Sequence, residues 1–340
     1  MIKSVGVWDK DENLSKNNFL FFNTDAGIGD NLLQPFNDLY IYGQKKGVNF
    51  VTLDTIESLK KIDVFIFFDF PNMKNKYVKK VFKLDSPKYL VILESKIIKP
   101  DNWDLNNHKL FDKIFTWNDD FIDDDKYFKI NFSSRFPNSI KKKINAKNKL
   151  CTLISGNKVV NHPLELYSKR IEAIRWFETN RPTDFDLYGM GWDEFKFTGP
   201  RIIRVLNKIK FLTRFLAASF PSYRGAVKEK KSTLEKYKFC ICYENARDIP
   251  GYITEKIFDC FVAGCVPIYW GANNVERHIP KDCFIDKKKF HDYEALYQHI
   301  KNMNDNEYIQ YLECIEIFLN SESIKQFSTE NFSQVIVSNI

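Results

Sequence analysis

One strand–helix–strand unit, between residues 237 and 271, limits what this chain can fold into. The stretch 239–243 is apolar and β-rich, and 266–270 repeats that pattern, as buried parallel strands do. Between them, apolar residues recur at helical spacing over 255–263, which predicts a crossover helix that packs on the sheet. Gly264 then ends the helix, at a position that often needs positive φ. The unit predicts an α/β protein with a parallel sheet.

Polar residues gather where this predicted helix begins. We expect Thr254 to cap the helix, and Asn245 to lie at the same edge of the sheet because it follows the first strand. Backbone N–H groups and the positive end of the helix dipole would lie beside Lys256, where an anion such as a diphosphate is stabilised. In the alternative interpretation, Glu255 and Lys256 form an ordinary solvated first turn and Tyr252 is a packing residue.

The ordered segments of this unit resemble the signature of the α-1,3/α-1,4-fucosyltransferase family (glycosyltransferase family 10), in its bacterial type. They are Glu244-Asn245, Gly251-Tyr252-Ile253-Thr254-Glu255-Lys256-Ile257 and Gly264-Cys265-Val266-Pro267-Ile268-Tyr269-Trp270-Gly271. That family transfers fucose from GDP-fucose to a sugar hydroxyl with inversion, on two facing Rossmann-like domains of the GT-B type. The resemblance therefore implies an α/β fold of GT-B architecture and a GDP-fucose-dependent glycosyltransferase.

Other segments occur in the order that the resemblance requires. The stretch 149–155, the turn that holds Asn157 and a predicted helix over 166–178 with Arg170 are similar to the start of the family's donor domain. A predicted strand over 88–93 leads to Glu94, which resembles the Glu of the family's acceptor-domain Glu-Ser site.

The sequence also departs from the family pattern. Lys96 stands where the family commonly has Pro after the Glu-Ser pair, and Gly251 stands where relatives often have Asp. The segment 200–220 has no recognisable counterpart.

The resemblance implies a role for each matching residue. Glu94 would be the catalytic base, Arg170 and Lys256 would stabilise the leaving diphosphate, and Tyr252 would contact the guanine. The remaining donor-binding residues would be Asn245, Thr254, Glu255 and Asn157. For Glu94 the alternative is an ordinary loop carboxylate.

The domain organisation follows from the same pattern. We expect an acceptor-binding Rossmann-like domain over 1–145, a GDP-sugar-binding one over 149–320, and a C-terminal segment, 321–340, that packs back on the first domain. The Lys- and Asn-rich run 138–148 reads as the linker. The pattern also predicts strands at 4–8, 19–22, 64–70 and 88–93, a helical stretch at 56–61, and a glycine-bearing loop at 26–30 that is either a turn or a ligand contact.

Cysteines and histidines argue against a metal or another cofactor. The 7 Cys and 5 His show no metal-ligand or disulfide-framework spacing, so Lys and Arg would neutralise the diphosphate. The cysteines are expected to be buried, as in a reducing compartment. The N-terminus resembles neither a signal peptide nor a membrane anchor, which predicts a cytoplasmic protein.

Basic and apolar residues alternate over 201–216, within a chain of net charge +7. This segment predicts an amphipathic helix that lies on an anionic membrane at its inner face, where a lipid-linked glycan acceptor would be found. The alternative is a helix docked on its own domain. Nucleic acid is not expected as a partner, because aromatic and basic residues do not alternate as in a stacking groove.

The leading hypothesis is an inverting α-1,3 or α-1,4 fucosyltransferase. Its acceptor would be a hydroxyl of a GlcNAc-containing oligosaccharide or lipid-linked glycan, in surface polysaccharide or lipopolysaccharide synthesis. One alternative is a non-catalytic GDP-sugar or glycan-binding protein on the same fold, and another is a glycosyltransferase that uses a different GDP-sugar. Glu94 distinguishes the transferase from the binding protein, because only the transferase needs a catalytic base.

Overall fold

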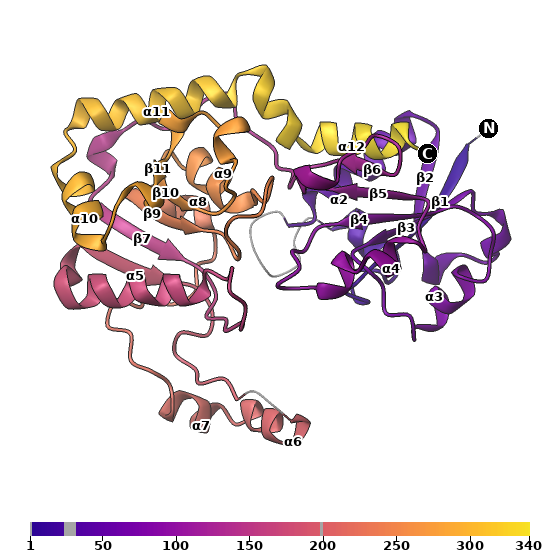
Figure 1. The fold of residues 1–340 in the computed structure, drawn as a ribbon, viewed down its shortest axis with the longest axis horizontal. Helices are drawn as coiled ribbons and strands as arrows, with labels where there is room; N and C mark the ends of the chain where they lie inside the picture. The colour runs from indigo at the N-terminus through magenta and orange to yellow at the C-terminus, as the bar shows by residue number, and fades with distance from the viewer. Residues whose placement is uncertain (1, 24–31, 198–199) are drawn as a thin grey trace.

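Two parallel β-sheets, each covered by helices, form the two halves of the molecule (Figure 1). The computed structural model describes residues 2–23, 32–197 and 200–340. The predicted loop 26–30 lies outside the described residues. The first sheet covers residues 3–129 and the second covers 149–286, so the segment 138–148 lies between them in the chain, and its Ile140 is buried in the core of the second domain.

The first sheet has the strand order β2-β1-β3-β4-β5-β6, and all its pairs are parallel. Its strands are β1 (Lys3–Asp9), β2 (Val48–Thr52), β3 (Val64–Phe68), β4 (Lys88–Ile92), β5 (Lys113–Thr116) and β6 (Tyr127–Lys129). Both faces of the sheet are buried, since separate apolar clusters pack on each side. The helices of this domain are α1 (Phe19–Phe22), α2 (Gln34–Lys45), α3 (Lys76–Val81) and α4 (Leu105–His108).

The second sheet has the order β11-β10-β9-β7-β8, again all parallel. Its strands are β7 (Lys149–Ile154), β8 (Phe185–Tyr188), β9 (Tyr237–Tyr243), β10 (Val266–Trp270) and β11 (Ile285–Asp286). The helices are α5 (Tyr167–Asn180), α6 (Arg201–Arg204), α7 (Lys210–Phe215), α8 (Lys230–Leu234), α9 (Glu255–Val262), α10 (Tyr293–Asn302) and α11 (Asp305–Leu319). The predicted unit β9-α9-β10 forms its centre, and Gly264 has the expected positive φ, +59°.

The end of the chain crosses from the second domain to the first. Helix α12 (Thr329–Ser338) follows α11 and packs on α2 (Figure 1). Its Phe332 and Ile336 are buried in the same apolar cluster as the strands of the first sheet. At the last turn, Tyr89 donates a hydrogen bond to the backbone oxygen of Asn339, 3.1 Å away. Helix α12 is therefore part of the first domain's core, whereas Ile324 and Phe327 just before it are buried in the core of the second domain.

Two predictions about local structure in the first domain are wrong. The stretch 19–22 is a short helix rather than a strand, because the chain turns at Asn17 and Asn18, both at positive φ, and then buries Leu20 and Phe21 from one helical turn. The stretch 56–61 is not a regular helix but holds only a 3-10 turn at Leu59–Lys61. Local apolar patterns are too short there to fix the secondary structure.

The segment 201–216 is not one amphipathic helix. It comprises α6, a 3-10 turn at Val205–Lys208 and α7. The helix is interrupted because the Asn207 side chain bonds to both backbone groups of Phe197, at 2.8 and 2.9 Å, and Ile209 leaves helical geometry. No helix among the described residues is long and apolar enough to cross a membrane.

Candidate functional site

The order of the second sheet places a crevice between β7 and β9. The chain leaves β7 toward β8 on one side and β9 lies on the other, which makes this the switch point where ligands bind in open α/β sheets. A cavity of about 30 Å³ lies there. Its polar lining includes Ser155, Arg170, Lys230, Lys256 and Asp259, and Lys230 Nζ lies 2.6 Å from Asp259 Oδ2. Among the described residues, the buried Ser155 hydroxyl has no hydrogen-bond partner, so this cavity contains charged groups of both signs and an unused hydroxyl.

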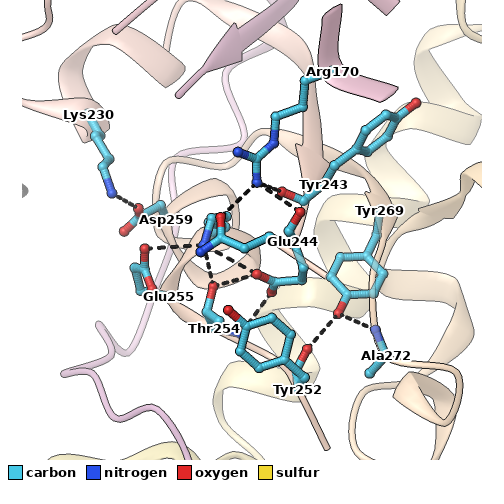
Figure 2. A network of polar contacts seen from close by, with 12 residues as sticks. Arg170, Lys230, Tyr243, Glu244, Tyr252, Thr254, Glu255, Asp259, Tyr269 and Ala272 are labelled. Atoms are coloured by element: carbon cyan, nitrogen blue, oxygen red, sulfur yellow. Dashed lines mark hydrogen bonds and ion pairs between the residues drawn. The ribbon is translucent and has the colours of Figure 1, made fainter. Parts of the chain in front are cut away.

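Glu244, at the end of β9, is the centre of a buried polar network (Figure 2). Its Oε1 accepts a hydrogen bond from the backbone N–H of Thr254, at 2.8 Å. Its Oε2 accepts from the Thr254 hydroxyl at 2.7 Å and from Lys256 Nζ at 3.3 Å. A fully buried carboxylate is costly unless it is paired and hydrogen-bonded, and here both conditions are met. The network fixes the entry into α9 against the end of β9.

Lys256 and Glu255 carry opposite charges at the first turn of α9. Burial opposes the charge on Lys256, but Glu255 and Glu244 outweigh it and raise the pKa of the ammonium. Desolvation likewise opposes ionisation of Glu255, and Lys256 and Lys230 overcome it, which lowers the Glu255 pKa to about 2. Both groups are therefore charged at neutral pH. The Glu255 side chain keeps 44 % of its surface exposed, so it can reach a ligand.

Arg170 reaches the same network from α5. It is 4 % exposed, and its Nη2 donates to the backbone oxygens of Tyr243 and Glu244, at 2.6 and 2.8 Å, and to Asn245 Oδ1 at 3.1 Å (Figure 2). Burial lowers the pKa of the guanidinium, yet the group keeps its charge because its ordinary pKa is above 12. Arg170 thus holds the β9 end in place and lines the cavity.

The prediction that Thr254 caps helix α9 is correct for its position but wrong for its side chain. Thr254 occupies the N-cap position of α9 in extended backbone, but its side chain makes no capping hydrogen bond. The hydroxyl is donated to Glu244 instead.

A second polar cluster lies at the switch point of the first sheet, where β1, β3 and β4 end. Lys10 Nζ lies 2.7 Å from Glu94 Oε1 and 2.8 Å from Asp69 Oδ2. Asp69, at φ +59°, also accepts hydrogen bonds from the backbone N–H groups of Leu93 and Glu94, at 2.8 and 3.0 Å. Asp9 lies beside them, and burial raises its pKa to about 7. Asp69 and Lys10 therefore fix both the backbone and the carboxylate of Glu94.

Glu94 faces the second domain across the junction between the two sheets. Tyr252, in the loop before α9, is 1 % exposed and packs on Trp117 of the first domain, with ring centroids 4.6 Å apart. Burial raises the pKa of the Tyr252 hydroxyl, and the negative charge of Glu94 adds to this effect. The base candidate and the donor-side loop therefore meet at this junction. Guanine could contact the Tyr252 ring only if the junction opened there.

Gly251 lies where the loop before α9 touches the first domain. It has φ +75°, and a Cβ atom built on it would lie 2.2 Å from the Trp117 carbonyl oxygen. A side chain at this position would push the loop away from the first domain. Next to it, Asn274 accepts from the Gly251 N–H at 2.9 Å and donates to Asp119 at 2.7 Å. This chain therefore closes the junction by direct backbone contact.

The structure brings together most, not all, of the predicted site residues. Arg170, Asn245, Thr254, Glu255 and Lys256 form one continuous network, with Tyr252 next to it and Glu94 on the facing domain. Asn157 has no described hydrogen bond to this network, and its Nδ2 donates instead to the backbone oxygen of Gly191 at 3.0 Å. Its donor-binding role, like the other individual roles, stays a prediction.

Sequence reasoning gave no site role to Glu244, Lys230 or Lys10. Glu244 stands in the signature segment, and its position directly after a buried strand was a usable signal. Lys10 likewise follows the first strand. Lys230 lies in a run of charged residues, and no spacing distinguishes it from its neighbours. In the described parts of the chain, no group of three or more His, Cys, Asp or Glu residues could hold a metal ion.

Comparison with known proteins places this site in a family. Residues 145–334 match the family described as glycosyltransferase family 10 (fucosyltransferase) C-term. A Helicobacter pylori α-(1,3)-fucosyltransferase is 33% identical over 108 residues, which are 32% of this chain and 22% of that protein. An Arabidopsis thaliana α-(1,4)-fucosyltransferase is 37% identical over 73 residues, which are 22% of this chain and 18% of that protein. The matches thus span about a fifth of these relatives' own length.

Solved structures show the same fold over almost the whole chain. A crystal structure of an α1,3-fucosyltransferase with GDP matches with a TM-score of 0.54 at 14% identity, and the match covers 99% of this chain and 90% of that one. A glycosyltransferase from Rickettsia africae matches with a TM-score of 0.55 at 10% identity, covering 99% and 97%. The two facing parallel sheets are a GT-B architecture, as the sequence predicts. Because the family match covers more than half of the chain, including β9, α9 and β10, the protein belongs to glycosyltransferase family 10, the fucosyltransferases.

Proposed function

We propose that this protein is an inverting fucosyltransferase that moves fucose from GDP-fucose to a hydroxyl of a GlcNAc-containing glycan, in α-1,3 or α-1,4 linkage. One observation carries the proposal: the family's signature residues form a network of paired charges at the switch point of the second sheet, and the Glu94 carboxylate of the first domain is near enough to raise the pKa of Tyr252 beside it.

The network suits a nucleotide diphosphate. Lys256 is held as a cation by Glu255 and Glu244, and it lies at the first turn of α9, where backbone N–H groups favour negative charge. Arg170 lines the same cavity and carries a second positive charge, while a third cation there, Lys230, is paired with Asp259 at 2.6 Å. We therefore propose that the donor diphosphate binds here without a divalent metal and that no other cofactor is required.

The reaction places negative charge on the departing GDP and removes a proton from the acceptor hydroxyl. The two sites suit these two changes. As the anomeric C–O bond to the β-phosphate breaks, the departing GDP gains negative charge next to Lys256, which stabilises it in the transition state. The acceptor oxygen attacks the anomeric carbon from the opposite face, and its proton goes to the Glu94 carboxylate. Attack opposite to the leaving group inverts the anomeric configuration.

Lys10 and Asp69 would position Glu94 for this proton transfer. The Lys10 amine, 2.7 Å from Glu94, holds the carboxylate toward the junction, and Asp69 fixes the backbone N–H of Glu94. Asp69 and Glu94 raise the pKa of Lys10 although burial opposes its charge. Lys10 therefore stays protonated at neutral pH and is a positioning residue, not a base.

The ion pair between Lys10 and Glu94 favours one alternative, a binding protein without catalytic activity. One oxygen of Glu94 is already paired with Lys10, which suits a protein that binds a GDP-sugar without turning it over. We keep the transferase as the proposal because Oε2 of Glu94 has no described partner, so it can accept the acceptor's proton.

The glycan acceptor and the cellular role belong to the same proposal. We propose a lipopolysaccharide or other surface polysaccharide as the destination, assembled by a cytoplasmic enzyme.

The test compares donors and acceptors with the purified chain. GDP-fucose, GDP-mannose and UDP-glucose would each be offered with N-acetyllactosamine, lacto-N-biose and lipopolysaccharide-type acceptors, without added metal. We expect transfer from GDP-fucose alone, with NMR showing α-linked fucose on O3 or O4 of GlcNAc and inversion relative to the donor. Transfer from another donor would refute the fucose assignment. Tight GDP-fucose binding with no transfer to any of these acceptors would favour the binding-protein alternative.

A further inference from the structure

An arm formed by residues 200–220 carries apolar side chains into solvent. It leaves the second domain between β8 and α8 and extends away from both sheets (Figure 1). The exposed fractions are 85% for Ile202, 82% for Phe211 and 77% for Phe215, and the rings of Phe211 and Phe215 stack with centroids 6.3 Å apart. Ile203, Val205, Ile209 and Leu216 are also exposed. Scattered exposed apolar residues are ordinary, but a contiguous group marks an interaction surface.

Polar contacts rather than apolar ones stabilise the conformation of the arm. Asn207 bonds to both backbone groups of Phe197, and the Phe195 N–H donates to the Thr213 backbone oxygen at 2.7 Å. Lys210 Nζ lies 2.7 Å from Glu194. Thr213 is 1% exposed, whereas the neighbouring aromatic rings face outward. Polar groups inside and apolar groups outside reverse the usual arrangement of a protein surrounded by water.

All charged side chains of the arm are positive. Its basic residues are Arg201, Arg204, Lys208, Lys210 and Arg214, and the stretch 200–220 contains no Asp or Glu. Among the described residues only Lys210 of these is in an ion pair. The other four are exposed and lie between the exposed apolar residues. A surface that combines unpaired cations with apolar side chains fits an anionic partner that also accepts apolar groups.

A second copy of this chain fits that description poorly. A two-fold contact would bring the same patch against itself, and its cations would then face one another without any carboxylate from the arm to separate them. A lipid surface instead offers anionic headgroups to the basic side chains and acyl chains to the Ile and Phe side chains.

We propose that the arm docks this protein on an anionic lipid bilayer, with Ile202, Phe211 and Phe215 inserted below the headgroups and Arg201, Arg204, Lys208 and Arg214 among them. The arm does not depend on the GDP-sugar site, since none of its residues lines that cavity. Docking would keep the protein beside acceptors that are themselves anchored in lipid.

Vesicle sedimentation tests the proposal. The purified chain would be mixed with vesicles of phosphatidylcholine alone and of phosphatidylcholine with 30 % phosphatidylglycerol, a fraction of about one third that gives a strongly negative surface. We expect binding to the anionic vesicles only, weakened by salt. Phe211→Ser with Phe215→Ser should weaken it about tenfold or more, because apolar burial is lost. Arg204→Gln with Arg214→Gln should weaken it about thirtyfold, since each basic residue near the surface contributes about 1 kcal/mol.

Exposed apolar residues elsewhere provide the matched control. Val159→Ser with Ile317→Ser removes side chains that are 81% and 71% exposed, and this variant should bind like the original chain. Equal binding by the Phe variant and the control variant would overturn the proposal. So would equal binding to neutral vesicles, or no binding to either vesicle together with arm-dependent dimerisation measured by light scattering.

Discussion

Gly251 lies where the donor-side loop touches the first domain, and the contact depends on a single atom. Its φ of +75° and its contact with the Trp117 carbonyl oxygen leave no room for a Cβ atom. The same loop carries Tyr252 and Thr254, whose polar groups meet Glu244 and the junction. One small residue therefore sets how close the donor-side loop lies to the first domain.

Replacing Gly251 by Ala should destabilise the protein by about 3 kcal/mol. Positive φ costs a non-glycine residue about 1 kcal/mol, and the forced shift against Trp117 adds about 2 kcal/mol. Urea unfolding measures the change. Gly47→Ala is the matched control, because Gly47 has the same φ, +75°, with nothing within 4 Å of the added Cβ. Equal losses in both variants would show that the Trp117 contact carries no energy.

Lys256→Met should weaken GDP binding and also lower stability by about 2 kcal/mol, because Glu244 stays buried without its cation. Calorimetry gives the first quantity and urea unfolding the second. Adding Glu244→Gln should restore much of the stability without restoring GDP affinity. Lys228→Met, at an exposed lysine, serves as the control. Recovery of GDP affinity in the double variant would contradict the role of Lys256 as phosphate ligand.

At the scale of helices and strands, long periodic patterns were predictable and short ones were not. The β9-α9-β10 unit was fully predictable because its strands are buried on both faces and α9 places Ile257, Phe258 and Phe261 on one side. In contrast, 19–22 looks extended by composition, yet tertiary contacts of Phe21 decide for a helix. Strand β2, whose buried and half-buried residues alternate, is not among the strands that the sequence predicts.

The residues of the candidate site also differ in how far the sequence predicts them. Residues whose position follows from a strand end or helix start, such as Glu94 and Lys256, could be identified from the sequence. Lys10 and Asp69 also follow strands, but their ion pair spans a long sequence separation, and local spacing carries no record of such tertiary contacts. The same holds for Lys230, which lines the site from α8. The closure of the junction over Tyr252 was likewise invisible.

Helix α12 contributes to the stability of the first domain through its buried side chains. Phe332 is 3 % exposed and lies edge-on to Phe36 of α2. Phe332→Ala should lower the free energy of unfolding by about 4 kcal/mol, the usual range for a buried Phe. Phe211→Ala makes the same change at a ring that is 82% exposed and should cost less than about 0.5 kcal/mol. A Phe332→Ala variant as stable as Phe211→Ala would show that α12 does not contribute to the core.

At the scale of the whole molecule, the two switch points face one junction. Asp119 holds this junction from the first domain, with Oδ2 2.8 Å from His278 Nε2 and 2.7 Å from Asn274 Nδ2. Lys129 contacts its other oxygen. Burial opposes the charge of Asp119, but hydrogen bonds from His278 and Lys129 outweigh it and hold the carboxyl pKa well below its ordinary value. The carboxylate form therefore stabilises the closed junction.

The direction of that shift fixes a pH dependence. A carboxyl with a depressed folded-state pKa contributes fully above the unfolded pKa, about 4, and its contribution is lost as pH falls further toward the folded value. Asp119→Asn should therefore be less stable than the original chain at pH 6, and the difference should shrink on acidification below about pH 4. Thermal midpoints between pH 3 and pH 7 report it. A gap that is constant across this range would contradict the account.

The most direct test of the central claim is the rate of acceptor-dependent GDP release from GDP-fucose. For Glu94→Gln we predict a fall in kcat of about a hundredfold or more, with KM for GDP-fucose nearly unchanged, since only the proton acceptor is lost. Lys256→Met should lose both kcat and donor affinity. Turnover by Glu94→Gln at the rate of the original chain would contradict the claim that a first-domain carboxylate acts across the junction on a donor bound beside α9.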